Sequence, residues 1–310
     1  MLLQSLGKGR ASEMRRLLTT TAEPLPVSFT SDNLQTVAQQ GSGQINVWNA
    51  ANMKTLVSPG EMLLNDTEYF RSDHIITIEN TSGSSVTYTL SHTPANTVLS
   101  IGPALGLANT APLPTTSSTA SVSFRTTTIT VNSRRTERVR VTFTAPSGLD
   151  PKTYPIYSGF IVVTGSNGEV FSIPYQGVAS KMKDMKIIDN SNTTFGINLP
   201  VIIDGGMFPH KEDKNWTFTG TDFPFLLYRL AAGTRSLVVD LVDKKTFVPK
   251  SVQTKRGLVD WLYDSWFGRK WEKKNSYAQI PVIGTLGTAP YAHRHEATGV
   301  SGTVLRSSII

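Results

Sequence analysis

The sequence predicts a mainly β protein in which an antiparallel two-sheet sandwich follows a short helical segment and precedes a second, incomplete β-rich unit. Three observations support this prediction. The first fifty residues carry apolar side chains at helical spacing, whereas after residue 53 apolar and polar residues alternate as they do in strands. Ser and Thr together exceed a fifth of the chain, while charged residues make up only 17%. We therefore expect three regions, residues 1–53, 54–181 and 182–310.

The composition of the chain excludes several kinds of structure and binding site. With 310 residues, 39% of them hydrophobic, the chain can bury more than one core. It has no cysteine, which excludes disulfides and thiolate metal sites. No apolar run approaches the length of a membrane-spanning helix. The net charge is +7, but the basic residues are scattered among turns, so a solvated surface is favoured over nucleic-acid binding.

The first residues predict two short helices. Leu2 and Leu3 are typical of the last turn of a helix that ends at the following glycines, Gly7 and Gly9. A second helix is predicted with Ser12 as its N-cap. Its apolar face comprises Met14, Leu17 and Leu18.

A third short helix is predicted after Gly41 and Gly43, with Ile45, Trp48 and Ala51 on its apolar face. Helices this short, with such small apolar faces, cannot form a core by themselves. We expect them to pack against another part of a protein.

The second region predicts a sandwich from short alternating strands. Residues 74–92 indicate a hairpin, with Ile76 and Ile78 before a Thr-Ser-Gly turn and alternation afterwards at Val86, Tyr88 and Leu90. Another strand alternates at Val139, Val141 and Phe143. A second hairpin joins 160–163 to 170–173 through Ser166-Asn167-Gly168. The Pro/Ala/Thr-rich stretch 94–119 predicts a surface loop.

The third region predicts more strands. Residues 223–243 indicate two strands around Ala232-Gly233-Thr234, and residues 279–287 indicate another. Between them, residues 256–271 predict a short helix that packs on a sheet. The chain ends in Gly-Thr-Val-Leu-Arg-Ser-Ser-Ile-Ile, which offers no obvious closing strand.

The search for a catalytic, cofactor-binding or metal-binding constellation returns no candidate residue. His74 and His92 fall in strand patterns and are interpreted as residues on a sheet face. His293 and His295 would lie on one side of a strand, but without a third ligand they indicate a solvated pair. The remaining histidine, His210, belongs to no motif.

Asn-x-Ser/Thr sequons mark four candidate N-glycosylation sites. They begin at Asn65, Asn80, Asn192 and Asn215.

Two stretches near the start resemble the end of a subtilisin-like serine protease domain. "RRLLTTTAEPL" contains the Leu-x-x-Thr-Ala pattern at 18–22, and "VAQQGSGQINVWNAA" contains the Gln-Gly-x-Gly turn and the Asn-Ala helix at 40–50. On this alignment Met1-Leu2-Leu3-Gln4 resembles the tail of the helix that begins with the catalytic serine. The resemblance implies that residues 1–53 are the remnant of a catalytic domain. Since Met1-Leu2-Leu3 is too short for a signal peptide, we expect Met1 to be an internal methionine or a truncated start.

The rest of the chain extends this resemblance. Residues 56–95 and 157–179 are similar to the entry and the last hairpin of the fibronectin type III-like accessory domain of large secreted subtilases. Residues 199–206 and 223–243 resemble the β-rich segment that follows. The catalytic Asp, His and Ser and the oxyanion Asn have no counterpart here, so the chain alone is expected to be inactive.

The resemblance implies a function and a location. The chain would be the C-terminal accessory region of a subtilisin-like endopeptidase that is extracellular or at the cell surface. Its expected partner is the missing catalytic domain, within one polypeptide, and association with a membrane or cell-wall surface is a further expectation. No cofactor is implied.

Two alternatives come from other classes of protein. One is a stand-alone cell-surface adhesion or carbohydrate-binding sandwich, which an exposed row of aromatic residues would support. Tyr88, Phe143 and Phe160 instead fall in positions typical of a core. The other alternative is binding to an anionic surface through the Lys/Arg/Trp-rich segment 255–274.

Overall fold

A computed structural model describes residues 11–104, 106–210, 214–217, 219–220, 222–245, 280–293 and 303–306. The structure divides into two units, Met1–Lys186 and Ile187–Ile310. Several sequence predictions lie outside the described residues: the helix end at 2–9, the helix at 256–271, the basic segment 255–274 and His295.

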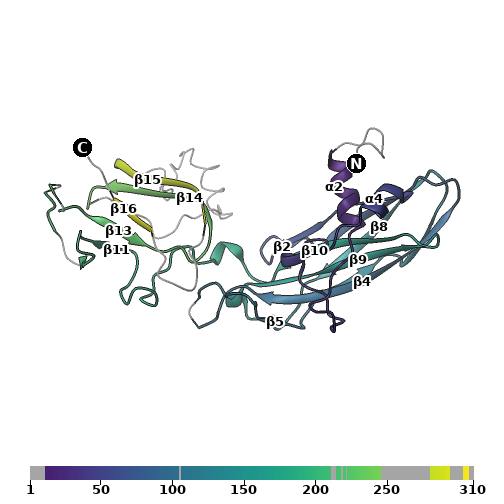
Figure 1. The fold of residues 1–310 in the computed structure, drawn as a ribbon, viewed down its shortest axis with the longest axis horizontal. Helices are drawn as coiled ribbons and strands as arrows, with labels where there is room; N and C mark the ends of the chain where they lie inside the picture. The colour runs from purple at the N-terminus through teal and green to yellow at the C-terminus, as the bar shows by residue number, and fades with distance from the viewer. Residues whose placement is uncertain are drawn as a thin grey trace, which may run out of the picture. The chain divides into compact units, whose positions relative to one another are not determined.

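The first unit contains a sandwich of two sheets (Figure 1). One sheet has the order β1-β3-β8-β6, formed by Thr55–Ser58, Asp73–Asn80, Thr136–Thr144 and Ser121–Phe124. The other has the order β2-β10-β9-β4-β5, formed by Met62–Asp66, Val170–Val178, Pro155–Gly165, Val86–Leu99 and Thr115–Thr116, with β7 (Thr128–Val131) also paired to β4. β2 runs parallel to β10, and the other strand pairs of this unit are antiparallel. The predicted antiparallel sandwich is confirmed.

The core lies between the inner faces of these two sheets. Alternate residues of each strand contribute to it, as the period-two pattern predicts. The predicted core positions Val139, Val141 and Phe143 of β8 are all buried. The largest fully buried aromatic side chains of the cluster are Tyr88, Phe143, Tyr157, Phe171 and Tyr175.

The predicted hairpin of β9 and β10 is confirmed. Val163 pairs with Phe171 and Ile161 with Ile173 across the antiparallel ladder. The turn follows the Ser-Asn-Gly signal, with Gly168 at a φ of 85° that glycine adopts without a steric penalty.

The other predicted hairpin is wrong. β3 and β4 are strands, but β3 pairs with β1 and β8 in one sheet whereas β4 pairs with β5, β7 and β9 in the other. Asn80 holds the connection between the two sheets in place. Its buried side chain donates to the carbonyls of Ser84 and Val131, at 2.8 and 3.0 Å. Its Oδ1 also accepts from the Ser82 N–H at 2.9 Å. Residues 81–85 therefore connect the two sheets instead of forming a tight turn within one.

The predicted loop at 94–119 begins too early. Residues 94–99 continue β4: Pro94 pairs opposite Gly159, and a bulge follows between Ala95 and Val98. Beyond β4, Ile101, Leu107 and Ala108 are buried, so this connection is partly covered as well.

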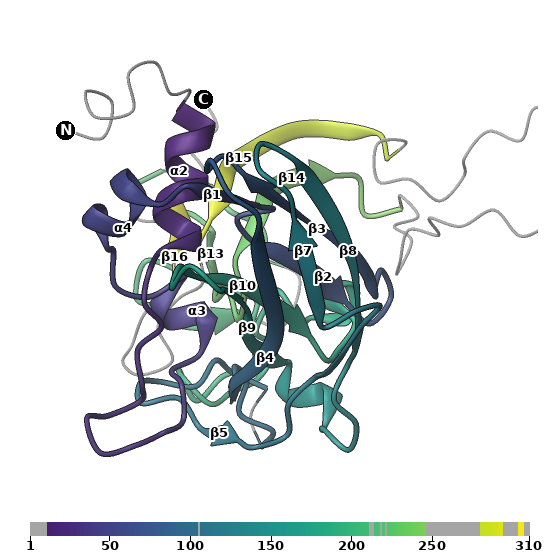
Figure 2. The same ribbon diagram turned by 90° about the vertical axis from the view of Figure 1, so that its right-hand side faces the viewer.

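Among residues 11–53, three helices precede the sandwich: α2 (Ala11–Thr20), α3 (Val37–Gln40) and α4 (Val47–Asn52). Figure 2 shows them along one side of the strands of the first unit. Ser12 lies inside α2 and is not its N-cap. Ile45 precedes α4, whose N-cap is Asn46, and the buried residue of α4 is Ala50. Ile45 therefore lies outside the helix on whose face it was predicted, and the side chains of Ile45 and Trp48 are both exposed.

The second unit contains two further sheets. One has the order β12-β11-β13-β16, formed by Pro209–His210, Val201–Ile203, Phe225–Tyr228 and Thr303–Arg306. β14 (Thr234–Val242) pairs with β15 (Val282–Ala292) in the other. The strands predicted around 232–234 and at 279–287 are confirmed as β13, β14 and β15. The expectation that the C-terminal residues supply no strand is wrong, because β16 pairs with β13.

Candidate functional site

Two histidines of the sandwich occupy structural positions. His74 lies in β3, with its ring edge-on to Phe143 at a centroid distance of 5.6 Å. His92 lies in β4, and its Nε2 is 2.8 Å from the Tyr175 hydroxyl. Burial lowers the pKa of His92 below its ordinary value, and mainly burial raises that of Tyr175. Both groups are therefore uncharged near neutral pH, and we assign them a structural role.

His210 lies within hydrogen-bond distance of the Asp204 carboxylate. Its Nε2 lies 3.0 Å from Asp204 Oδ2, while Asp204 Oδ1 accepts from the backbone N–H groups of Gly206 and Phe208. These hydrogen bonds, that from Phe208 first, hold the pKa of Asp204 below its ordinary value. The cluster fixes the β11–β12 turn. Within the described ranges, no group of three His, Cys, Asp or Glu side chains is arranged to hold a metal ion.

A buried ion pair in the second unit was missed in the sequence. Arg229 Nη1 donates to Asp189 Oδ2 at 3.1 Å, and each side chain is only 1% exposed. Asp189 Oδ1 also accepts from the backbone N–H and the hydroxyl of Ser191, at 2.9 and 2.7 Å. The available signal was the single arginine inside the apolar run 225–232, since a charge in such a run requires a buried partner.

Six of the exposed large apolar side chains lie in the segment that precedes the sandwich. We call this set the N-terminal apolar surface. It comprises Leu25, Val27, Phe29, Ile45, Val47 and Trp48. Trp48 is 76% exposed, and Phe29 is as exposed as in an extended peptide. Apolar side chains that gather on a surface commonly mark a contact with another protein part.

The same segment is firmly joined to the sandwich. Thr36 is fully buried, and its hydroxyl lies 3.2 Å from the Ser158 hydroxyl of β9. The Ser158 hydroxyl also accepts from the Val37 N–H at 3.1 Å. Leu17 of α2 is buried, so the apolar face of this helix is already covered within the described chain. Only part of the apolar surface predicted for this segment is therefore exposed.

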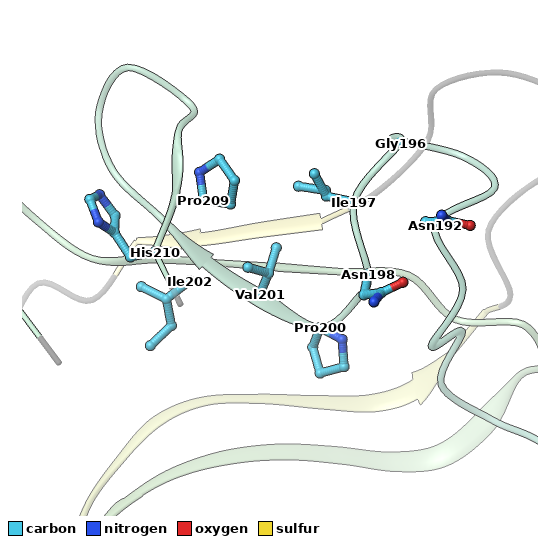
Figure 3. A pocket seen from close by; sticks show the side chains of 9 residues that line it. All are labelled: Asn192, Gly196, Ile197, Asn198, Pro200, Val201, Ile202, Pro209 and His210. Carbon is cyan, nitrogen blue, oxygen red and sulfur yellow. The ribbon is translucent and has the colours of Figure 1, made fainter. Parts of the chain in front are cut away.

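A pocket lies in the second unit (Figure 3). It has a volume of about 540 Å³, and residues around β11 and β12 line it. Prolines and aliphatic side chains form its apolar walls: Ile197, Pro200, Val201, Ile202 and Pro209. Its polar groups are Asn192, Asn198 and His210. This mixture suits a ligand with both polar groups and apolar faces.

The four sequon asparagines differ in their environments. Asn80 is fully buried and its side chain is occupied by the hydrogen bonds of the sheet-to-sheet connection. Asn65 is half-buried, and its Nδ2 donates to the Tyr69 carbonyl at 3.1 Å. Asn192 and Asn215 are exposed. The structure therefore favours the last two as attachment sites and disfavours Asn80.

Comparison with solved structures gives only weak similarities. The PapD-like domain 7 of human CEP192 is 12% identical, with a TM-score of 0.30, and the match covers 41% of this chain and 86% of that one. The chaperone–tip adhesin complex CsuC-CsuE of Acinetobacter baumannii is 12% identical, with a TM-score of 0.28, and the match covers 59% and 81%. The CooA pilin subunit of enterotoxigenic Escherichia coli is 17% identical, with a TM-score of 0.26, and the match covers 42% and 100%. These scores are too low to support an argument about function.

Comparison with protein families is more specific. No curated protein matches the chain. The family model described as Fn3-like domain matches residues 62–176, which correspond to the sandwich from β2 to β10. The chain therefore contains a fibronectin type III-like domain.

Proposed function

We propose that this chain is the C-terminal accessory region of a secreted, subtilisin-like serine endopeptidase. In this proposal the Fn3-like sandwich braces a catalytic domain, and the two belong to one polypeptide. The chain contributes no catalytic residue of its own.

The observation that carries the proposal is the segment 11–53. It resembles the end of a subtilase catalytic domain in sequence, and it is anchored to the sandwich through Thr36, Val37 and Ser158. It nevertheless presents the N-terminal apolar surface to solvent. A segment that is fixed on one side and apolar on the other is suited to join two parts of a protein. The Fn3-like family is also typical of subtilase C-terminal regions.

The adhesion or carbohydrate-binding alternative receives less support. A row of exposed aromatic side chains on the sandwich would support it. Tyr88, Phe143 and Phe160 are all buried, and the exposed Phe29 and Trp48 precede the sandwich. A membrane or cell-wall association stays a proposal for the parent protein. No helix in the described ranges has the length and hydrophobicity to cross a bilayer.

The first test is sequencing of the genomic locus and of the 5′ end of the transcript. The proposal expects an upstream frame that encodes a Gly-Thr-Ser helix start shortly before Met1 and, farther upstream, the catalytic Asp, His and oxyanion Asn. A locus without such coding potential in any frame would refute the proposal and favour the adhesion alternative.

The second test is chemical. A serine-directed phosphonate probe requires a serine activated by a histidine and a carboxylate. We expect the purified 310-residue chain to remain unlabelled, while the longer product of the locus reacts stoichiometrically. Labelling of the short chain would reveal a catalytic arrangement that this proposal does not contain.

The third test concerns the N-terminal apolar surface. In the longer product, Ile45→Ser with Trp48→Ser should shorten the half-life of protease activity, because both side chains would lose their apolar partner. Ile75→Ser is the matched control, since Ile75 is a similarly exposed aliphatic residue on β3 of the sandwich. Equal half-lives for the two variants would exclude this surface as the contact.

A further inference from the structure

Asn192 combines two features. It begins the sequon Asn192-Thr193-Thr194, and it also lines the pocket of the second unit. Figure 3 shows it on the loop that faces Asn198 and the β11 segment. A group attached to its side chain would therefore start at the wall of the pocket.

The loop that carries Asn192 is held in a defined shape. The buried Asp189, fixed by Arg229, accepts two hydrogen bonds from Ser191, the residue directly before the sequon. The Asn192 carbonyl then accepts from the Gly196 N–H at 2.8 Å, which closes the turn. This arrangement fixes the direction of the attachment point relative to the pocket walls.

The pocket matches the chemistry of a sugar ring that bears an acetamido group. Its volume of about 540 Å³ falls within the range of about 300–1,000 Å³ typical of small-ligand sites. Asn198 is exposed and offers an amide for hydroxyl groups, and His210 is held in place by Asp204. Ile202 offers apolar surface to the methyl group or the ring C–H face, whereas Val201 lies on the other face of β11.

We propose that Asn192 is N-glycosylated and that the first N-acetylglucosamine of the glycan rests in this pocket. The donor is a polyprenyl diphosphate-linked oligosaccharide, and the transferase of the secretory pathway joins it to the chain. The bond from Asn192 Nδ2 to sugar C1 forms as the C1–O bond to the diphosphate breaks. Nδ2 loses one proton to a base of the transferase, and the lipid diphosphate leaves with the bonding electron pair. The proposal rests on the secreted location in the proposed function, but not on protease activity.

The experiment uses the full chain, secreted from a eukaryotic host with an added leader. Glycopeptide mass spectrometry gives the occupancy of each sequon. The native protein is then treated with an amidase that cleaves the Asn–sugar linkage, and release is followed at Asn192 and at Asn215. Asn215 is the matched control, because it is also exposed but does not line the pocket.

We expect Asn192 to be occupied and its glycan to be released about tenfold more slowly than that of Asn215, which corresponds to about 1.4 kcal/mol of docking free energy. Asn198→Ala with Ile202→Ser should bring the two rates together, while thermal unfolding verifies that the variant is folded. Ile75→Ser in the first unit should leave both rates unchanged.

Two results would overturn the proposal. An unoccupied Asn192 in secreted protein would refute the modification. An occupied Asn192 that is released as fast as Asn215 would refute the docking. Neither result depends on the coding content of the locus, so failure of the proposed function and failure of this inference are distinguishable.

Discussion

At the scale of single residues, two reciprocal tyrosine–glycine pairs shape the centre of the sandwich. On the β9–β10 ladder Tyr157 lies opposite Gly177, and Gly159 lies opposite Tyr175. Each ring covers the glycine across the ladder, and both tyrosines are buried. Burial raises the pKa of Tyr157 to about 12, so its hydroxyl remains neutral. The absence of a side chain at the glycines thus makes room for two large aromatic rings.

Gly177→Ala should destabilise the first unit by about 1–3 kcal/mol, the usual cost of overpacking a core. A Cβ at this position would lie 2.5 Å from Tyr157 Cζ and closer still to its hydroxyl oxygen. Gly83→Ala is the control, because no atom lies within 4 Å of its added Cβ. Urea unfolding measures both variants. Equal stability would mean that Tyr157 moves aside without cost.

In the second unit, the notable buried residues are the ion pair of Asp189 and Arg229. Burial alone would raise the pKa of Asp189, but hydrogen bonds from Ser191 and the Arg229 guanidinium outweigh it and hold this pKa below its ordinary value. The ionised carboxylate is therefore the form that stabilises the fold. This stabilisation is fully present above the pKa of the unfolded chain, about 3.9, and is lost as the pH falls through the lower folded value.

Asp189→Asn should destabilise the second unit by about 3–5 kcal/mol, because it removes the carboxylate opposite a buried guanidinium. The variant should also lose less stability than the parent when the pH is lowered below about 4. Asp222→Asn is the control, since its pair with Lys214 is partly exposed and, like most surface ion pairs, contributes little to stability. Tryptophan fluorescence during urea unfolding, at several pH values, provides the measurement. A small effect for Asp189→Asn would show that the pair contributes little.

At the scale of elements, the sequence predicts strands better than it predicts their partners. The β9–β10 hairpin was predictable because its turn residues lie between two apolar runs of matching length. β3 and β4 have the same alternation, yet they belong to different sheets. Period-two patterning shows which face of a strand is buried, but not which neighbour it pairs with. Asn80 stabilises the connection between the two sheets through a hydrogen bond to Val131, which is distant in the sequence. Local sequence patterns do not reveal such a contact.

The candidate sites show the same limit: a local motif identifies the residue, but not its environment in the fold. The sequons were found from short motifs, but only the fold shows that Asn80 is buried and that Asn192 lines a pocket. Leu17, the buried leucine of α2, was predicted from its helical spacing. Ile45 was predicted on one helical face with Trp48, because helical periodicity does not reveal where a four- to six-residue helix begins. Here Asn46 caps the helix one residue before Val47, so Ile45 lies outside it.

Ser158→Ala tests how the helical segment is held. It removes the hydroxyl that bonds Thr36 and accepts from the Val37 N–H, so a partly buried backbone donor would lose its partner. We expect faster hydrogen exchange at residues 36–41, while the amides of β9 and β10 remain protected. Ser91→Ala is the control, because this serine lies on the exposed side of β4. Unchanged exchange at 36–41 would show that other contacts hold the segment.

At the scale of the whole molecule, the sandwich carries its own core. Every buried residue of the main hydrophobic cluster lies between Val57 and Tyr175. The helical segment adds Leu17, Ala22 and Ala50, which are buried but do not belong to this cluster. The sandwich thus has what a single domain needs to fold independently, whereas the preceding segment depends on the sandwich for its burial.

Residues 54–186 expressed alone should therefore fold. We end the fragment at Lys186 because Glu68 pairs with Lys183 and the Asp66 carboxylate accepts from the Met182 N–H at 2.8 Å, so these contacts at the end of the unit are retained. Circular dichroism and urea unfolding should show one cooperative transition, at a lower midpoint than that of the same unit within the full chain. The midpoint falls because removal of residues 1–53 exposes Ser158 and the surface of β9 and β10 that α2 and α3 cover. Fragment 11–186, which keeps the helices, is the matched control and should regain the difference. A fragment 54–186 without a cooperative transition would show that the helical segment is an obligatory part of the domain.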